Sequence, residues 1–211
     1  ATQDIATDGL AVSRLPPQQQ NTFRKTVDAI SIAAHAIATL QTVISREIDP
    51  LESAVITIGK ISGGSAYNVI ADEVVFEGTV RTVTPEVRQF VAKRIGEILQ
   101  GVAKTMRGRC KYKYHFGYPP LYNDPEFTHR FATIAASIVG EKHVFEIDRP
   151  SMGGEDMAYF LNEAPGAFFY VPSCNANKGH TFPHHHPKFD IDEDFLWLGS
   201  ALLVATGMGW Q

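Results

Sequence analysis

The chain has 211 residues, of which 44% are hydrophobic and 20% are charged, and its formal net charge is −4. This composition predicts a folded protein with one or two ordinary cores. The negative balance, with no run of five like charges, argues against nucleic acid as a partner. No apolar run approaches the ~20 residues that span a bilayer, so we expect no membrane segment. Cys110 and Cys174 belong to no CxxC pattern, which predicts reduced thiols and a cytoplasmic protein.

The first half of the chain begins with little periodicity and then becomes helical. Residues 1–25 contain Pro16 and Pro17, which predicts an irregular entry segment. Residues 26–46 show a helical period and predict a helix that Asp49 and Pro50 end. Its predicted buried stripe is Val27, Ile30, Ala34, Ile37 and Gln41, with Ala33, Leu40 and Ile44 beside it.

Two alternating segments follow and predict strands. Residues 54–60 place Ile56 and Ile58 on one face. Residues 73–83 alternate more clearly, with Arg81 on the outward polar face. The inward positions of this second strand are Val74, Phe76, Gly78 and Val80.

Thr84 and Pro85 predict the start of a helix, because a hydroxyl cap is followed by a proline at the first helical position. The helix is expected to reach Lys104 and to bury Val87, Val91, Ile95, Ile98 and Val102. Residues 110–116 alternate as another strand. This order predicts an α+β open sandwich, an antiparallel sheet with two helices on one face, whose first strand should precede residue 26.

The sequence changes character at Pro119 and Pro120, which predicts a domain boundary between residues 26–118 and 119–211. The second region alternates helices and short strands, as in part of an α/β layer. The predicted helices are 124–139, 155–161 and 193–208, the predicted strands are 144–147 and 167–171, and a long loop covers 172–190.

Three groups of residues are candidates for chemistry. The loop carries His180, His184, His185 and His186, which favour metal binding, although surface polar histidines fit the spacing equally well. Gly153, Gly154 and Glu155 begin a predicted helix, where backbone N–H groups attract a substrate carboxylate, or where Glu155 and Asp156 are a simple helix cap. Arg81 offers a bidentate fork for a carboxylate, or an exposed salt bridge to Glu77 or Glu73.

Taken in order, these segments resemble one family, the metallo-amidohydrolases of the aminoacylase and carboxypeptidase type. It includes hippurate hydrolases, plant indole-acetyl-amino-acid hydrolases and other N-acyl-amino-acid hydrolases. The matching text is TVDAI, LQTVISREIDPLESAVITIG, GGSAYNVIADEVVFEGTVRTVTPEVR, MGGED and HHHPKFDIDE, in family order along most of the chain.

The resemblance implies a lid and dimerisation domain over residues 26–118 and the C-terminal half of a catalytic domain over 119–211. It implies an enzyme with two metal ions, zinc or manganese, that hydrolyses the amide bond of N-acyl amino acids or small peptides beside a free carboxylate. The family pattern His-x-Pro-x-Phe-Asp makes His185 the expected metal ligand, flanked by His184 and His186. Asn68 and Arg81 match lid residues that hold the substrate carboxylate, sometimes across a homodimer interface. Gly153, Gly154 and Glu155 match a loop beside the active site.

The sequence also departs from the family. The N-terminal catalytic half, with most metal ligands and the paired glutamates, does not precede residue 26, so this chain alone is expected to be inactive. The family's lid histidine aligns with Gln19, its Pro-His with Phe23 and Arg24, and its Ile-Pro-Asp with residues 70–72. The leading hypothesis is a portion of a metal-dependent hydrolase, and the alternative is a non-catalytic dimerisation or binding module.

Overall fold

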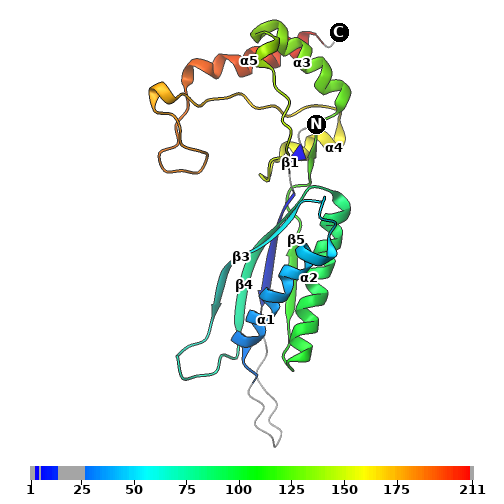
Figure 1. The fold of residues 1–211 in the computed structure, drawn as a ribbon, viewed down its shortest axis with the longest axis vertical. Helices are drawn as coiled ribbons and strands as arrows, with labels where there is room; N and C mark the ends of the chain where they lie inside the picture. The colour runs from blue at the N-terminus through cyan, green and yellow to red at the C-terminus, as the bar shows by residue number, and fades with distance from the viewer. Residues whose placement is uncertain (1–2, 5, 14–26, 210–211) are drawn as a thin grey trace, which may run out of the picture. The chain divides into compact units, whose positions relative to one another are not determined.

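The computed structural model describes residues 3–4, 6–13 and 27–209. They divide into two compact units, each of which is considered by itself. We call the first, Gln3–Leu121 with Arg149–Phe160, the sheet unit. The second, which comprises residues 122–148 and the described residues from Leu161 onward, is the histidine-loop unit. Both are mixtures of helix and extended chain, so the protein is a mixed α/β structure (Figure 1).

The sheet unit is built on four antiparallel strands with the spatial order β3-β4-β2-β5. Its elements are β2 (Ala6–Ser13), α1 (Ala29–Thr42), the π-helical turn η1 (Val43–Glu47), β3 (Ala54–Gly63), β4 (Val74–Thr82), α2 (Pro85–Thr105) and β5 (Lys111–His115). Two further short strands, β1 (Gln3–Asp4) and β6 (Leu121–Tyr122), pair with each other. The long antiparallel hairpin of β3 and β4 and the flanking helices are visible in Figure 1.

The predicted elements of this unit are confirmed, with two corrections. Residues 6–13 form β2 instead of an irregular segment, and β2 is the first strand whose position the sequence pattern left open. Helix α1 buries Ala29, Ala33, Ala36 and Leu40, whereas Ile30 of the predicted stripe is 49% exposed. Alanine occurs on several faces of this helix, and the sheet selected the stripe whose small side chains allow close packing.

Both helices pack on the inward side chains of the sheet. Phe76 and Val80 of β4 join one apolar cluster with Val91, Ile95 and Leu99 of α2. Thr84 caps α2 as predicted, because its Oγ accepts a hydrogen bond from the amide of Val87 at 3.4 Å. Outward residues of β3 and β4 are largely exposed, so the described helices cover one face of the sheet and leave the other face open.

The histidine-loop unit contains helices and loops in its described part. Its elements are α3 (Pro125–Val139), the 3-10 turns η2 (Glu141–His143), η3 (Ala176–Lys178) and η4 (Glu193–Phe195), and α5 (Leu196–Met208). Helix α4 (Met157–Glu163) crosses the boundary between the units. The predicted helices are confirmed to within a few residues.

The two strands predicted for the second region are wrong. Residues 144–147 and 167–171 are extended or irregular but belong to no sheet, and Phe145 is 78% exposed. An extended segment becomes a strand only when a neighbour supplies hydrogen bonds. The described residues of this unit supply side chains instead: Asn123 binds the backbone of Phe168 through both its amide nitrogen and its amide oxygen.

Both cysteines are free thiols, as the sequence predicted: Cys110 is partly buried and Cys174 is exposed. Burial raises the pKa of the Cys110 thiol above its ordinary value. Within the described ranges, no helix combines the length and the apolar character needed to cross a bilayer.

Candidate functional site

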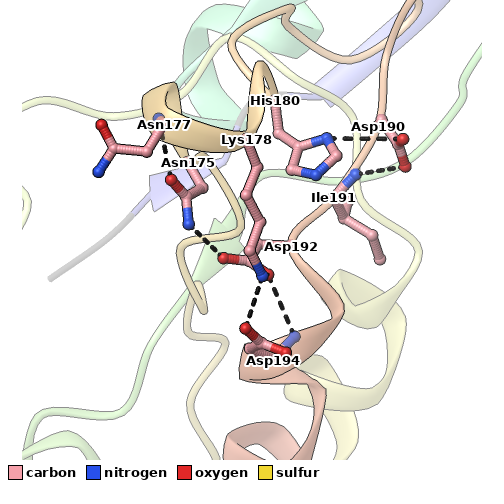
Figure 2. A network of polar contacts seen from close by, with 8 residues as sticks. All are labelled: Asn175, Asn177, Lys178, His180, Asp190, Ile191, Asp192 and Asp194. Atoms are coloured by element: carbon pink, nitrogen blue, oxygen red, sulfur yellow. Dashed lines mark hydrogen bonds and ion pairs between the residues drawn. The ribbon is translucent and has the colours of Figure 1, made fainter.

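The loop that carries four histidines is closed at its base by hydrogen bonds. Asn175 and His180 form a backbone bridge, with both N–H···O distances at 3.0 Å. The side chain of Asp192 accepts hydrogen bonds from Lys178 Nζ and Asn175 Nδ2, each at 2.5 Å (Figure 2). Lys178 also reaches Asp194 at 2.5 Å, so one ammonium joins two carboxylates. These contacts, which we call the loop clamp, tie the start of the loop to the segment that follows it.

The loop clamp places a carboxylate out of contact with solvent. Asp192 is 2% exposed, and its partners supply the charge and hydrogen bonds that such a group requires. The hydrogen bond from Lys178, and to a smaller extent the one from Asn175, lowers the pKa of Asp192 to about 2. The same carboxylate raises the pKa of the Lys178 ammonium. The clamp is therefore charged at neutral pH.

The three adjacent histidines occupy three different environments. The ring of His186 stacks on Phe182 with 4.3 Å between centroids, and its Nδ1 accepts a hydrogen bond from the amide of Lys188 at 3.1 Å. His184 meets Phe189 edge to face at 4.7 Å. His185 has its ring 6.4 Å from that of His184 and makes no side-chain hydrogen bond within the described part of the chain. Its two neighbours are thus held by aromatic rings, and its own nitrogens are open.

His185 also has an unusual backbone. Its φ is +66°, in the left-handed region that non-glycine residues seldom adopt. Such a conformation persists only where the surroundings impose it, and it is found more often at functional sites. The residue is exposed on the loop surface. It meets the requirements for one metal ligand.

A closed metal site needs three or more ligands placed together. The described residues contain no group of three or more His, Cys, Asp or Glu side chains that is placed to hold an ion. Within the loop, His180 Nδ1 lies 3.5 Å from Asp190 Oδ2, which brings together two potential metal-binding groups and not three. A binuclear centre therefore does not fit the described residues by themselves, and no catalytic step through a metal follows from them.

Arg81 makes a contact that the sequence did not reveal. Its outward side chain donates a hydrogen bond from Nη1 to the backbone carbonyl of Met152, the residue before Gly153. Glu77, one of the two salt-bridge partners considered for Arg81, pairs with Lys60 at 3.1 Å. Two candidate groups, Arg81 and the glycine segment, therefore lie together inside the sheet unit.

Of the two carboxylates predicted as a possible helix cap, Glu155 contacts the start of α4. Glu155 Oε1 accepts a hydrogen bond from the amide of Met157 at 3.3 Å, which caps the start of α4. The amide of Gly153 donates to Ser151 Oγ at 3.1 Å, and Gly154 is exposed. The role of these residues toward a substrate stays a prediction.

Asn68 lies far from Arg81 within one chain. It belongs to the exposed turn that joins β3 to β4, just beyond the pairing of Gly63 with Val74, whereas Arg81 pairs with Val55 at the other end of the hairpin. Since an antiparallel strand rises ~3.4 Å per residue, roughly 24 Å separates these two ends. Residues 19, 23 and 24, the other departures from the family pattern, lie outside the described residues, and Ala71 is buried.

The residues of the loop clamp were missed by sequence reasoning. Asn175, Lys178 and Asp192 share no periodic spacing, and Lys178 and Asp192 are fourteen positions apart. One signal was present: Asp190, Asp192 and Asp194 alternate, which singles out a segment whose carboxylates need partners. Nothing in the spacing identified Lys178 as that partner.

Comparison with known proteins places these residues in a family. The model of peptidase family M20/M25/M40 matches residues 20–207. The N-acetyl-L-cysteine deacetylase of Bacillus subtilis (strain 168) is 40% identical over 180 residues, which are 85% of this chain and 41% of that protein. The N-acetyldiaminopimelate deacetylase of the same organism is 36% identical over 182 residues, covering 85% of this chain and 46% of the relative.

A solved structure shares the fold as well as the sequence. The Bacillus subtilis YXEP protein, described as a dinuclear metal-binding peptidase of the M20 family, superposes with a TM-score of 0.74 at 27% identity. The match covers 96% of this chain and 49% of that one. The chain spans less than half the length of all three proteins. On the family match and these identities, the chain belongs to peptidase family M20/M25/M40.

Proposed function

We propose that this chain is a portion of a metal-dependent hydrolase that cleaves the amide bond of N-acyl amino acids, or of small peptides, beside a free carboxylate. The observation that carries the proposal is the state of His185: exposed, strained at φ +66°, and unbonded between two histidines that aromatic rings hold. It stands where the family pattern has a metal ligand. The names of the two deacetylases support an N-acylated amino acid as substrate.

In this proposal His185 supplies one ligand to a centre of divalent ions, zinc or manganese, whose other ligands lie outside the described residues. Such ions activate water and polarise the scissile carbonyl. The chain by itself then holds less than one tightly bound ion, because a single exposed imidazole binds a metal weakly.

Arg81 is the proposed anchor of the substrate carboxylate. Its guanidinium is permanently charged and planar, and the hydrogen bond to Met152 fixes its orientation without using all of its N–H donors. Gly153 and Gly154 follow that carbonyl and leave room for a substrate to approach the backbone. Glu155 holds the adjoining helix start.

Asn68 needs a second copy of the chain to act on the same substrate. Roughly 24 Å of strand separates it from Arg81, which is more than a small N-acyl amino acid spans. A homodimer formed through the sheet unit would bring the Asn68 turn of one chain to the Arg81 end of its partner. The terminal strand β3, with Val55 40% and Ile61 55% exposed, is the surface we assign to that contact.

The central experiment measures bound metal and N-acetyl-amino-acid hydrolysis for the complete protein that contains this chain. His185→Ala should remove both, whereas the matched controls His184→Ala and His186→Ala should keep most of each. Equal losses in all three variants would show that the loop, and not the single imidazole, carries the effect. Metal content and turnover unchanged by His185→Ala would refute the proposal.

A mixed-dimer experiment tests the shared substrate site. One subunit carries Arg81→Ala and the other carries Asn68→Ala, and each homodimer should be nearly inactive. If the sites are shared across the interface, each mixed dimer keeps one intact site and recovers activity. If both residues act on the substrate of their own chain, the mixed dimer stays inactive.

A non-catalytic dimerisation or binding module is the second candidate. It is favoured by the lack of a three-ligand cluster among the residues that the structure describes. This alternative predicts a stable dimer that does not hydrolyse N-acyl amino acids even at high protein concentration. Turnover that a chelator abolishes would exclude it.

A further inference from the structure

A row of basic side chains runs from the end of α2 along the terminal strand β5. Residues 104–115, KTMRGRCKYKYH, contain five lysines and arginines and no carboxylate, in a chain whose overall charge is −4. Arg107, Arg109, Lys111 and Lys113 occupy alternate positions and are all exposed. We call these four residues the basic stripe. The stripe is not a contiguous run of charge, because one uncharged residue separates each basic residue from the next.

The residues that alternate with the basic side chains point toward the apolar core. Cys110, Tyr112 and Tyr114 are partly buried against the apolar core. The hydroxyl of Tyr112 donates to the carbonyl of Ala92 in α2 at 2.7 Å, which ties the strand to the helix. In a strand, alternate side chains point to opposite faces. The inward tyrosines therefore place Lys111 and Lys113 on the sheet face that no described helix covers, and Arg107 and Arg109 precede the strand.

The charges of the stripe are not neutralised within the described chain. Elsewhere basic groups have close carboxylate partners, such as Lys60 with Glu77 at 3.1 Å and Arg94 with Glu47 at 2.5 Å. None of the four stripe residues forms an ion pair with another described residue. The sheet register pairs Lys111 with Ser13 and Lys113 with Ala11, neither of which is charged.

The backbone at the start of the stripe is a second, independent observation. Arg107 follows the C-cap of α2, Met106, with φ +62°, a position where glycine is the usual residue. Glycine stands one place later instead: a Cβ on Gly108 would lie 2.4 Å from Ile32 Cδ1. A bulky cation thus occupies a strained position whose local geometry favours glycine, which indicates a use beyond folding.

We propose that the basic stripe is a docking surface for an extended acidic segment of a partner protein, with a carboxylate at every second residue. An extended peptide repeats every two residues at ~6.8 Å, which is also the spacing of Lys111 and Lys113 along β5. The four stripe residues are neither aromatic rings for stacking bases nor apolar side chains for entering a lipid interface, and one imidazole, His115, follows them along the strand. Charge and spacing therefore favour an acidic peptide over nucleic acid and membrane.

The test is peptide binding to this chain, followed by fluorescence anisotropy. The probe is an eight-residue peptide of alternating Glu and Thr, and its control has the same composition with the four Glu residues in one block. We expect the alternating peptide to bind about tenfold more tightly at low salt, and both to weaken as salt screens the charges. Equal affinity for the two peptides would contradict the proposed matching of spacing.

Charge reversal locates the site. Lys111→Glu with Lys113→Glu should lower the affinity for the alternating peptide by at least about tenfold. The control pair, Arg46→Glu with Lys142→Glu, changes the net charge equally at exposed residues that do not belong to the stripe and should bind as the wild type does. Lysines that only protect a terminal strand from aggregation would be replaced by glutamates without effect on binding. That result overturns the proposal.

Arg107→Gly separates folding from docking. Removing the strained side chain should raise the melting temperature by about 2–4 °C while weakening peptide binding. Unchanged binding in this variant would remove Arg107 from the site. Tighter binding of single-stranded oligothymidylate or of phosphatidylserine vesicles than of the alternating peptide would overturn the choice of partner.

Discussion

The sheet unit and the histidine-loop unit are stabilised in different ways. In the sheet unit, Leu40, Val80 and Ile95 are fully buried, and helices and strands contribute to one apolar cluster. In the histidine-loop unit, two of the buried residues are polar, Asn123 and Asp192, and large apolar side chains stay exposed, among them Trp197 at 59% and Met208 at 73%. The sheet unit buries one extended apolar cluster, whereas the described part of the histidine-loop unit buries few large apolar side chains and uses hydrogen bonds to buried polar groups.

The difference shows where functional residues can be placed. Arg81 projects from a strand that the core holds rigidly, and His185 projects from a loop that polar contacts hold at its base. A side chain on a well-packed strand is held more precisely than one on a loop. The uncovered side chains of α5, such as Leu203 and Val204, agree with the proposal that this chain is one portion of a larger hydrolase.

The largest expected effect is on the core of the sheet unit. Leu99→Ala, at a side chain 1% exposed, should destabilise the protein by about 2–5 kcal/mol. Leu202→Ala in the histidine-loop unit should cost less than about 2 kcal/mol, because its surroundings are looser and can relax. Urea unfolding followed by circular dichroism, and by tryptophan fluorescence for the unit that holds Trp197, measures both. Leu51→Ala, at a side chain 94% exposed, is the control. Equal losses at Leu99 and Leu202 would break the comparison.

A glycine pair in α2 tests how tightly the helix packs on the sheet. Gly101→Ala meets no atom within 4 Å and should stabilise the helix by about 0.5–1 kcal/mol. The Cβ of Gly96→Ala would lie 2.8 Å from the ring of Tyr112, so the helix gain should be reversed to a net loss of about 1–3 kcal/mol. Thermal unfolding compares the two variants. Stabilisation by both would mean that α2 is not pressed against β5.

Thr82 is the exception in the sheet unit. Its hydroxyl is fully buried and has no hydrogen-bond partner among the described residues. Thr82→Val should therefore stabilise the protein by about 1 kcal/mol, since it removes an unsatisfied polar group and keeps the shape. Thr79→Val, on the exposed face of the same strand, should change little. A loss of stability in Thr82→Val would show that the hydroxyl has a bonded partner.

The smallest effect on global stability is expected in the loop clamp, where the response is local and depends on pH. The folded pKa of Asp192, about 2, lies below its ordinary value of 3.8, so its contribution is present above about pH 4 and is lost as pH falls toward 2. Protection of loop amides from hydrogen exchange should fall over this range. In Asp192→Asn the pH response should vanish, whereas Lys178→Arg should retain it. A loop that stays protected at pH 2 would show that other contacts hold it.

Sequence patterns predicted correctly those helices and strands whose conformation depends mainly on their own residues. The cap at Thr84 with Pro85 predicted the start of α2, and the alternation around Phe76 predicted β4, because short-range sterics and solvent exposure decide both. The same reasoning failed at residues 144–147 and 167–171. Their residues favour extended chain, but the pairing that makes a strand depends on a neighbour that local pattern does not contain.

The sequence by itself determined the family, the order of elements in the sheet unit and the candidates Arg81 and His185. Each of these can be identified from the local spacing of residues or from an ordered set of motifs. Only the tertiary structure decided which face of α1 is buried, that Arg81 reaches Met152, and that Lys178 and Asn175 hold Asp192. The hydrogen bonds connect residues that are 14 to 71 positions apart, and the buried face of α1 is one of several apolar faces of that helix. The free energy of such contacts depends on where the chain folds back on itself, which no short window of sequence records.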